Sequence, residues 1–599
     1  MTPAGQAPSS KTYLAGPRSG EAGTDSGPRE SLSDPYRRGS WIRPGPVTDC
    51  DGPARPAERC GPRTRSRDMI GPTGHNSRET SVPHSIDEAF TALPLRVLAD
   101  AALARARSLG AEHADFRFER VRSAAWRLRD GKPSGSSDTT DLGYAVRVVH
   151  GGTWGFASGV DLTPDAAAKV ASQAVAMAKL SAQVIRAAGS DVGAPPTPFG
   201  QWGRVELADE PVHAEKTWVS SYEIDPFTVP DEEKTGLLTD WSARLLAADG
   251  VNHVDASLLT VHENKFYADT SGTVTTQQRV RLHPQLTAVS VDESTGEFDS
   301  MRTLAPPVGR GWEYLTGTGW DWDSELERIP ELLAEKMRAP SVEAGVYDLV
   351  VDPSNLWLTI HESIGHATEL DRALGYEAAY AGTSFATFDK LGKLKYGSEL
   401  MNVTGDRTAE HGLATIGFDD EGVEGQSWDL VKDGTLVGYQ LDRRIARLTG
   451  FGRSNGCAYA DSPSHVPVQR MANVSLQPDP GGLSTEDLIG GVDRGIYVVG
   501  DRSWSIDMQR YNFQFTGQRF FKIENGRITG QLRDVAYQAT TTDFWGSMAA
   551  VGGPQTYVLG GAFNCGKAQP GQVAAVSHGC PSALFKSVNI LNTTQEAGR

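Results

Sequence analysis

Apolar residues first recur with a clear period just after residue 85. Between residues 95 and 109 they stand three or four positions apart, and the pattern stops at Gly110. That spacing places them on one face of an α-helix, and glycine is a common residue just beyond a helix end. The expected buried face consists of Leu95, Leu98, Ala99, Ala102, Leu103 and Ala106.

Alternation of apolar and polar residues follows this helix and predicts strands. The alternating stretches are 114–128 and 143–149, and the second connects to 154–157 through His150-Gly151-Gly152, which is typical of a hairpin turn. An alanine-rich amphipathic pattern over 163–182 then predicts another helix. Helix, strands and helix together predict an α+β module over residues 84–194.

Two further modules are expected downstream. Residues 199–307 carry a helical pattern at 231–248 and alternating stretches at 256–268 and 274–282, which predicts a central α+β module. Residues 343–595 start with a strand pattern at 345–351 and continue as short alternating runs between glycine turns. We therefore expect an α+β protein whose C-terminal domain is mainly antiparallel β-sheet.

One long helix interrupts this β-rich region. Asp352-Pro353 directly follows the strand pattern at 345–351, and it combines an N-cap residue with proline at the first helical position. The helix should run for about 20 residues.

Residues 1–83 have a different character from the rest. They are rich in proline, glycine, serine and arginine and show almost no apolar periodicity. Such a segment buries too little surface to offset its ordering entropy. We expect a disordered tail, or a start of translation further downstream, for instance at Met69.

Composition narrows the classes of partner. The chain of 599 residues has a net charge of −17 and a pI near 5.3, whereas binders of nucleic acid or membrane surfaces need an excess of lysine and arginine. No apolar run approaches the roughly 18 residues of a membrane span, and no secretory signal is evident. Five scattered cysteines do not suggest a disulfide framework. The expected location is the cytoplasm.

Candidate chemistry lies inside the long helix, at His361-Glu362-Ser-Ile-Gly365-His366. The two histidines are five residues apart, one more than in the familiar His-Glu-x-x-His zinc motif, so on a regular helix they would diverge by roughly 140°. A π-type bulge absorbs one extra residue and is most frequent at functional sites. Gly365 is the residue best able to tolerate that distortion.

The motif has a functional and a structural interpretation. In the first, His361 and His366 bind zinc, and Glu362 acts as general base towards a water that the metal activates. In the second, the histidines only bond to backbone carbonyls of a polar helical turn. A catalytic zinc commonly has a third protein ligand, and the residues alone leave seven candidates: Glu369, Asp371, Cys457, His465, Cys565, His578 and Cys580.

These motifs and several later ones resemble the TldD/PmbA proteins, and specifically the TldD branch of zinc metallopeptidases. The residues that carry the resemblance are His361 to His366 with Glu369 and Asp371, Phe418-Asp-Asp-Glu-Gly422, Gly434-x-Leu-x-Gly-Tyr439, Gln469-Arg-Met-Ala-Asn473, Gly495-Ile-Tyr497 and Cys565-Gly-Lys567. The likeness covers about 500 residues, from near Ser85 to Asn592.

The resemblance implies a site and a partner. It implies one Zn²⁺ per chain bound by His361, His366 and Cys565, with Glu362 as general base and Glu369 in a supporting role. It also implies cleavage of short or unfolded peptides by a heterodimer with a metal-free, PmbA/TldE-like homologue. No nucleic acid or membrane partner is expected.

Two other interpretations of the sequence were considered, and one segment differs from the family pattern. The dipeptidyl-peptidase III type shares His-Glu-x-x-x-His, but the downstream Glu-Glu-x-x-x-Glu helix of that type is missing from this sequence. The chain could also be the non-catalytic, PmbA-like subunit, although it keeps both histidines and the glutamate. Where TldD proteins commonly carry Gly-Gly-Gly after Gly-Ile-Tyr, this chain has Val498 to Ser505, including Arg502 and Trp504.

Overall fold

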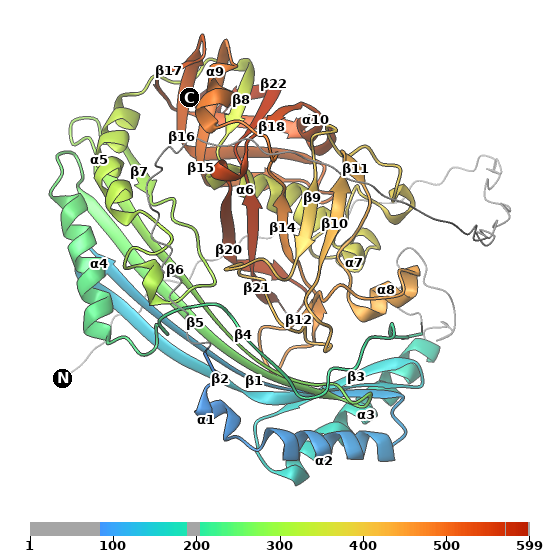
Figure 1. Cartoon of the computed structure of the whole chain (residues 1–599). Coiled ribbons are helices and arrows are strands. Elements are labelled where there is room, and N and C mark those ends of the chain that lie inside the picture. The colour runs from blue at the N-terminus through green and yellow to red at the C-terminus, as the bar shows by residue number, and fades with distance from the viewer. Residues whose placement is uncertain (1–83, 188–203, 570, 597–599) are drawn as a thin grey trace, which may run out of the picture. The chain divides into compact units, whose positions relative to one another are not determined.

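The computed structural model describes residues 84–187, 204–569 and 571–596 (Figure 1). The expected tail, residues 1–83, lies outside these ranges. Within them the chain mixes helices with largely antiparallel sheets, so the expected α+β class is confirmed.

Five helices and seven strands come from the N-terminal half of the described chain. The helices are α1 (Glu88–Thr91), α2 (Leu95–Ser108), α3 (Pro164–Ala187), α4 (Asp231–Leu246) and α5 (Trp322–Arg338). The strands are β1 (His113–Arg129), β2 (Lys132–His150), β3 (Thr153–Gly159), β4 (Lys216–Val219), β5 (His253–Asp269), β6 (Val274–Val291) and β7 (Phe298–Arg302).

All seven strands belong to one sheet, with the order β3-β2-β1-β5-β6-β4 and β7 beside β6. β1 pairs antiparallel with β5 from Asp115 opposite Asp269 to Arg129 opposite Asp255. The stretches expected as separate modules, 84–194 and 199–307, are therefore joined by a continuous hydrogen-bonded ladder. Alternation along a strand fixes which residues share a face, but it does not specify a partner strand more than 100 residues away.

The two faces of this sheet differ in chemistry. Even-numbered residues of β1 and β5, such as Phe116, Trp126 and Leu258, pack under the helices α2 to α5. Odd-numbered residues, such as Arg117 and Lys265, are buried on the opposite face, against the C-terminal half of the chain. The period-two geometry of strands thus separates an apolar layer from a buried charged layer.

The helices predicted at 95–109, 163–182 and 231–248 are present as α2, α3 and α4, whereas α1 and α5 were not predicted. The six residues expected on the inner face of α2 are all buried. α5 was not predicted, because its sequence is highly charged, contains Pro330 and follows a stretch rich in glycine and tryptophan. It forms because Leu326, Ile329 and Leu333 pack into the core and Asp321 caps its start. None of the helices in the described ranges is long and apolar enough to cross a membrane.

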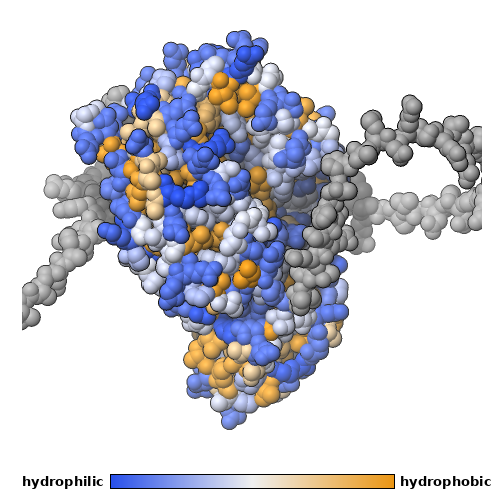
Figure 2. Space-filling model, turned by 60° about the vertical axis from the view of Figure 1, so that its left-hand side comes forward, coloured by the Kyte–Doolittle hydropathy of each residue, from blue (hydrophilic) through white to orange (hydrophobic). Residues whose placement is uncertain are grey.

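Apolar side chains also reach the surface in places. They gather towards the lower end of the face shown in Figure 2, at the level of α2 and α3. The large exposed apolar residues of these two helices are Val97, Met177, Leu180 and Val184.

The C-terminal half is mostly β-sheet. Its strands are β8 (Gly345–Val351), β9 (Val403–Asp406), β10 (Ser427–Lys432), β11 (Thr435–Leu436), β12 (Ala458–Tyr459), β13 (Val468–Gln469), β14 (Asn473–Leu476), β15 (Arg494–Ile506), β16 (Asn512–Glu524), β17 (Arg527–Leu532), β18 (Val535–Thr540), β19 (Met548–Val551), β20 (Val558–Lys567), β21 (Gln572–Cys580) and β22 (Ala583–Asn592). Its helices are α6 (Pro353–Ile360), α7 (Leu370–Ala373), α8 (Arg443–Thr449), α9 (Thr485–Gly490), α10 (Thr541–Gly546) and α11 (Thr593–Glu596).

The largest of its sheets packs against α6 through strand β15. The strand order is β15-β8-β22-β18-β16-β17, and an additional pairing of β15 with β16 closes five of these strands into a ring. β8 and β15 are parallel, while the other pairs in this sheet are antiparallel. The expectation of a mainly antiparallel C-terminal domain is confirmed.

The stretch Phe418–Gly422 docks the C-terminal half onto the charged face of the N-terminal sheet. The Lys265 Nζ atom donates to both carboxylate oxygens of Asp420, at 3.0 and 2.8 Å. The Arg147 guanidinium donates to Glu421 at 2.9 Å. All four side chains are buried, so this acidic motif serves the assembly of the fold.

Replacing Lys265 by methionine should destabilise the protein strongly. Asp420 would keep only the more distant Arg117, at 3.6 Å, and loss of one partner of a buried ion pair costs about 3–5 kcal/mol. Urea unfolding followed by tryptophan fluorescence measures the change. The matched control is Lys432→Met, because Lys432 pairs with Asp429 on the exposed surface and exposed pairs contribute little. Equal midpoints for the two variants would contradict the docking role.

Candidate metal centre

The long helix begins where β8 ends, in the middle of the C-terminal half. The Asp352 side chain accepts a hydrogen bond from the backbone N–H of Ser354 at 2.9 Å, and Pro353 occupies the first turn. Seven of the eight residues of α6 are buried. The helix therefore delivers its C-terminal end, and the motif that follows, into the protein interior.

The helix changes its winding at the motif. His361–Gly365 form a π-helical turn, and the His366 N–H donates to the His361 carbonyl. The expected π-type bulge is therefore present. It brings the two imidazole rings to the same side, with centroids 4.7 Å apart.

A glycine occupies position 365 for a different reason from the one that the sequence suggested. Its backbone lies in the ordinary right-handed helical region, at φ −52° and ψ −59°, so the bulge itself does not demand glycine. A Cβ at this position would instead lie 2.5 Å from the Met471 sulfur. Glycine at this position leaves room for the Met471 side chain, which packs directly against the turn.

Cys565 joins the two histidines. It lies on β20 next to a break in the β20–β21 register between Ala562 and Cys565, and such bulges redirect side chains near functional sites. The ligand atoms of His361, His366 and Cys565 lie within 4.8 Å of one another, and all three residues are buried. The Cys565 sulfur is 3.6 Å from His366 Nε2.

A carboxylate orients the His366 ring. Nδ1 of His366 lies 2.8 Å from Glu369 Oε2. Glu369 is buried, and Lys567 and Arg372 hold its pKa well below the usual value although burial alone would raise it. An ionised carboxylate accepts only, so Nδ1 carries the proton and Nε2 presents a lone pair towards Cys565.

A second histidine orients His361 in the same way. His578 Nδ1 lies 2.9 Å from the Val474 carbonyl, which can only accept, so this nitrogen carries a proton. Burial lowers the pKa of His578 well below its usual value and keeps the ring neutral, so Nε2 is an acceptor. His361 Nδ1, 2.7 Å away, therefore donates to it. The remaining nitrogen of His361, Nε2, is left with a lone pair.

The charges around Cys565 favour a thiolate. Burial alone raises the pKa of the Cys565 thiol, but nearby positive charge, including that of Arg470, lowers it below the usual value. Lys567 is the cation nearest to Cys565 in the sequence. Lys567 instead donates to Glu369 at 3.0 Å and to Asp371 at 2.8 Å, and Arg470 donates to the Cys565 carbonyl.

Glu362 is buried beside the cluster and paired with a residue that the sequence did not suggest. The Arg510 Nη1 atom donates to Glu362 Oε2 at 2.9 Å. Arg510 lies in the β15–β16 turn at φ +63°, an uncommon conformation for a non-glycine residue. No motif surrounds Arg510 in the sequence, so only the fold identifies this contact.

The other candidate ligands have different surroundings. Burial raises the pKa of Cys457 to about 11, and Cys580 lies 3.7 Å from the Pro353 carbonyl. His465 pairs with Asp461 at 2.6 Å. Among the described residues, only the set of His361, His366 and Cys565 brings three potential ligands together in this way.

This donor set fits zinc. Tetrahedral coordination with Zn–N near 2.0 Å and Zn–S near 2.3 Å places neighbouring ligand atoms roughly 3.3–3.6 Å apart. The separation of Cys565 Sγ from His366 Nε2 already lies in that range. Two imidazole lone pairs and a thiolate are also the ligand types that zinc prefers.

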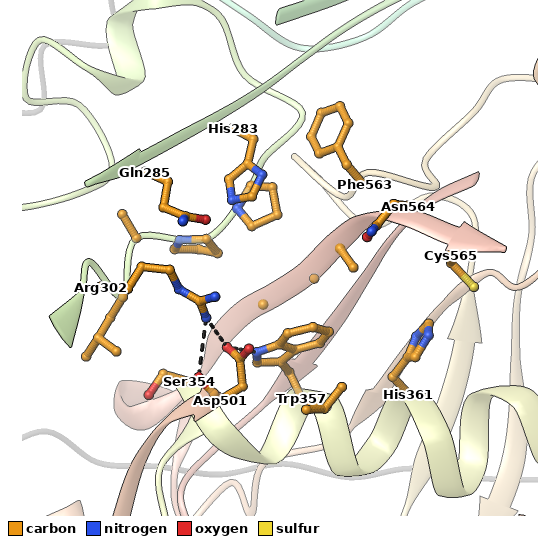
Figure 3. Close-up of a pocket in the computed structure, with 18 of the residues that line it drawn as sticks. His283, Gln285, Arg302, Ser354, Trp357, His361, Asp501, Phe563, Asn564 and Cys565 are labelled. Atoms are coloured by element: carbon orange, nitrogen blue, oxygen red, sulfur yellow. Dashed lines mark hydrogen bonds and ion pairs between the residues drawn. The ribbon is translucent and has the colours of Figure 1, made fainter. Parts of the chain in front are cut away.

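A cavity of about 550 Å³ opens beside the cluster. Its lining includes His361, Glu362, His366 and Cys565, together with residues of β6, β7, α6, β15 and β20 (Figure 3). The N-terminal sheet thus supplies one wall of the cavity and the C-terminal half supplies the others. Buried potential ligands with access to such a cavity are the arrangement expected of a catalytic site.

Two family models match the sequence. The one described as the PmbA/TldA metallopeptidase C-terminal domain matches residues 344–592, which include the whole cluster. The one described as PmbA/TldA metallopeptidase domain 1 matches residues 114–178.

The sequence is also similar to individual proteins that are named as metalloproteases. A protein of Methanothermobacter thermautotrophicus named metalloprotease is 27% identical over 80% of this chain and 96% of its own length. A protein of Saccharolobus solfataricus named zinc metalloprotease TldD homolog is 25% identical over 45% of this chain and 57% of its own length.

A solved structure shares the fold. The crystal structure of TldE from Thermococcus kodakarensis matches with a TM-score of 0.59 and 17% identity, over 82% of this chain and 99% of that one. The matching domains, the similarity to named relatives over most of the sequence and the common architecture lead to one conclusion: the chain belongs to the TldD/PmbA family.

Proposed function

We propose that this protein is a zinc-dependent peptidase of the TldD type that hydrolyses short or unfolded peptides. One observation carries the proposal: two imidazoles, a cysteine and the Glu362 carboxylate converge on the wall of one cavity. The name of the Saccharolobus relative agrees with zinc as the metal. The proposed stoichiometry is one ion per chain, and the proposed location is the cytoplasm.

His361, His366 and Cys565 would hold the metal. Bound there, zinc would supply Lewis acidity, lowering the pKa of water and polarising a peptide carbonyl. Glu369 fixes the tautomer of His366 and His578 fixes that of His361, so each ring keeps a lone pair for the metal. Such orienting partners typically contribute a factor of about 10–100 to metal affinity.

Glu362 would act as the general base and then as the general acid. It is the carboxylate next to His361 in sequence, and it lines the cavity where substrate would lie. Arg510 holds one of its oxygens, which fixes the direction of the carboxylate. Glu362 would accept a proton from the attacking water and return it to the departing amine, and such proton transfer contributes about 10²–10⁴-fold.

The cavity limits the substrate to extended chain. Its volume of about 550 Å³ accommodates a few residues but no folded domain. A peptide that reaches the cluster must therefore be short or unfolded.

We further propose a heterodimer with a metal-free, TldE-like homologue. The family resemblance motivates the partner, and the shared fold with TldE agrees with a pair of similar subunits. Co-expression with a TldE-like protein should give a complex of one chain of each, which light scattering after size exclusion measures, and higher peptidase activity than either chain alone. Separate elution and unchanged activity would reject the pairing.

Cys565→Ala should lower zinc affinity by several orders of magnitude, because it removes one of three ligands and the negative charge among them. His578→Phe should lower it less, about 10–100-fold, because it removes only the acceptor that orients His361. Competition with a chromogenic chelator measures both constants. Affinity unchanged in Cys565→Ala would show that another residue completes the site.

Glu362→Gln should keep the zinc content and lose peptide cleavage by at least about 10²-fold, because an amide cannot accept the proton. Metal analysis and cleavage of a fluorogenic peptide check the two halves of this statement. The exposed Glu399→Gln is a matched control that should behave as the wild type. If the wild type with bound zinc cleaves no peptide, alone or with the partner, the alternative of a non-catalytic PmbA-like subunit is favoured.

A further inference from the structure

The cavity continues away from the metal cluster along α6. Ser354 and His361 both line it and are seven residues apart on the helix, a distance of about 10 Å along its axis. An extended peptide advances about 3.3–3.6 Å per residue. The far end of the cavity therefore meets the substrate about three residues from the bond at the cluster.

Arg302 offers unused donors at this far end. Its Nη2 atom donates to Asp501 Oδ1 at 2.7 Å (Figure 3). Its Nε and Nη1 atoms make no hydrogen bond to any of the described residues. The side chain is one-third exposed, so this guanidinium is held in place and still open to a ligand.

Gln518 offers a second donor beside it. Its Oε1 accepts the backbone N–H of Arg302 at 2.7 Å, which identifies Nε2 as the other end of the amide. This Nε2 is buried and has no partner in the described part of the chain, and the residue is only 5% exposed. Leaving a buried amide N–H unpaired costs about 1–3 kcal/mol, so an acceptor from a ligand would relieve a real penalty.

The ionic balance around these donors is positive. Three cations share two carboxylates here, since Arg302 pairs with Asp501 while Lys336 and Arg502 both pair with Asp299. His283 also lines this end, and burial, helped by Arg302, lowers its pKa to about 4, so it is neutral at pH 7. Unused N–H donors and one surplus positive charge select an anionic acceptor.

We propose that this end of the cavity binds a carboxylate of the substrate peptide through Arg302 and Gln518. The inference rests on the proposed peptidase function and adds a substrate class to it. The carboxylate belongs either to the C-terminus of the peptide or to an aspartate or glutamate side chain about three residues from the cleaved bond. Arg502, which stands in the segment that departs from the glycine-rich family pattern, adds to the positive field.

Binding to the zinc-loaded Glu362→Gln variant tests this without turnover. Four versions of one short peptide carry glutamate or glutamine inside the sequence and a free or amidated C-terminus. Calorimetry should show that either the two glutamate peptides bind more tightly than the two glutamine peptides, or the two peptides with a free C-terminus bind more tightly than the two amidated ones. The expected difference in affinity is about 10–100-fold, the range for a charge-assisted hydrogen bond. The pair that shows the preference identifies the source of the carboxylate.

Arg302→Gln in the same background should abolish the preference, and Asp501→Asn should increase it, because it frees the guanidinium. Arg447→Gln, on α8 and outside the cavity, is the matched control and should keep the preference. Equal binding of all four peptides, absence of binding, or a preference that survives Arg302→Gln would overturn the inference. Failure of the wild type to cleave peptides is a separate result, which would reject the peptidase function.

Discussion

The candidate site depends on one main-chain hydrogen bond, from the His366 N–H to the His361 carbonyl. It spans five residues instead of four and so absorbs the extra residue of the motif. In a regular helix the two imidazoles would diverge by roughly 140°. The π turn brings them together, and the surrounding core holds it because Met471 packs against Gly365. The family motif and the departure from regular helix geometry are therefore the same feature.

Each group at the site is fixed by a partner from another element. Glu369 and His578 leave a lone pair on each imidazole, and Arg510 fixes Glu362. The environment of Cys565 favours the thiolate that a metal requires. The site is thus organised by buried polar contacts before any metal binds.

The charged face of the N-terminal sheet connects the fold to this site. Its buried ion pairs with Phe418–Gly422 hold the two halves together, and the same face supplies His283 and Arg302 to the cavity. A buried ion pair is costly unless its partners stay in register. The docking charges and two residues of the cavity wall therefore lie on the same face of one sheet.

Local patterns in the sequence were enough to predict most of the N-terminal helices and strands and the chemistry of the motif. Helical period gave the inner face of α2, alternation gave the strands, and the five-residue spacing predicted the π turn, because all of these depend on neighbours in the chain. The pairing of β1 with β5, the formation of α5, and the contacts of Arg510 and His578 with the motif come from the tertiary structure alone, and Cys565 was expected there only from the family resemblance. The paired residues of β1 and β5, and the residues that contact the motif, stand about 125 to 220 positions apart in the sequence, and no local period encodes a partner at that distance.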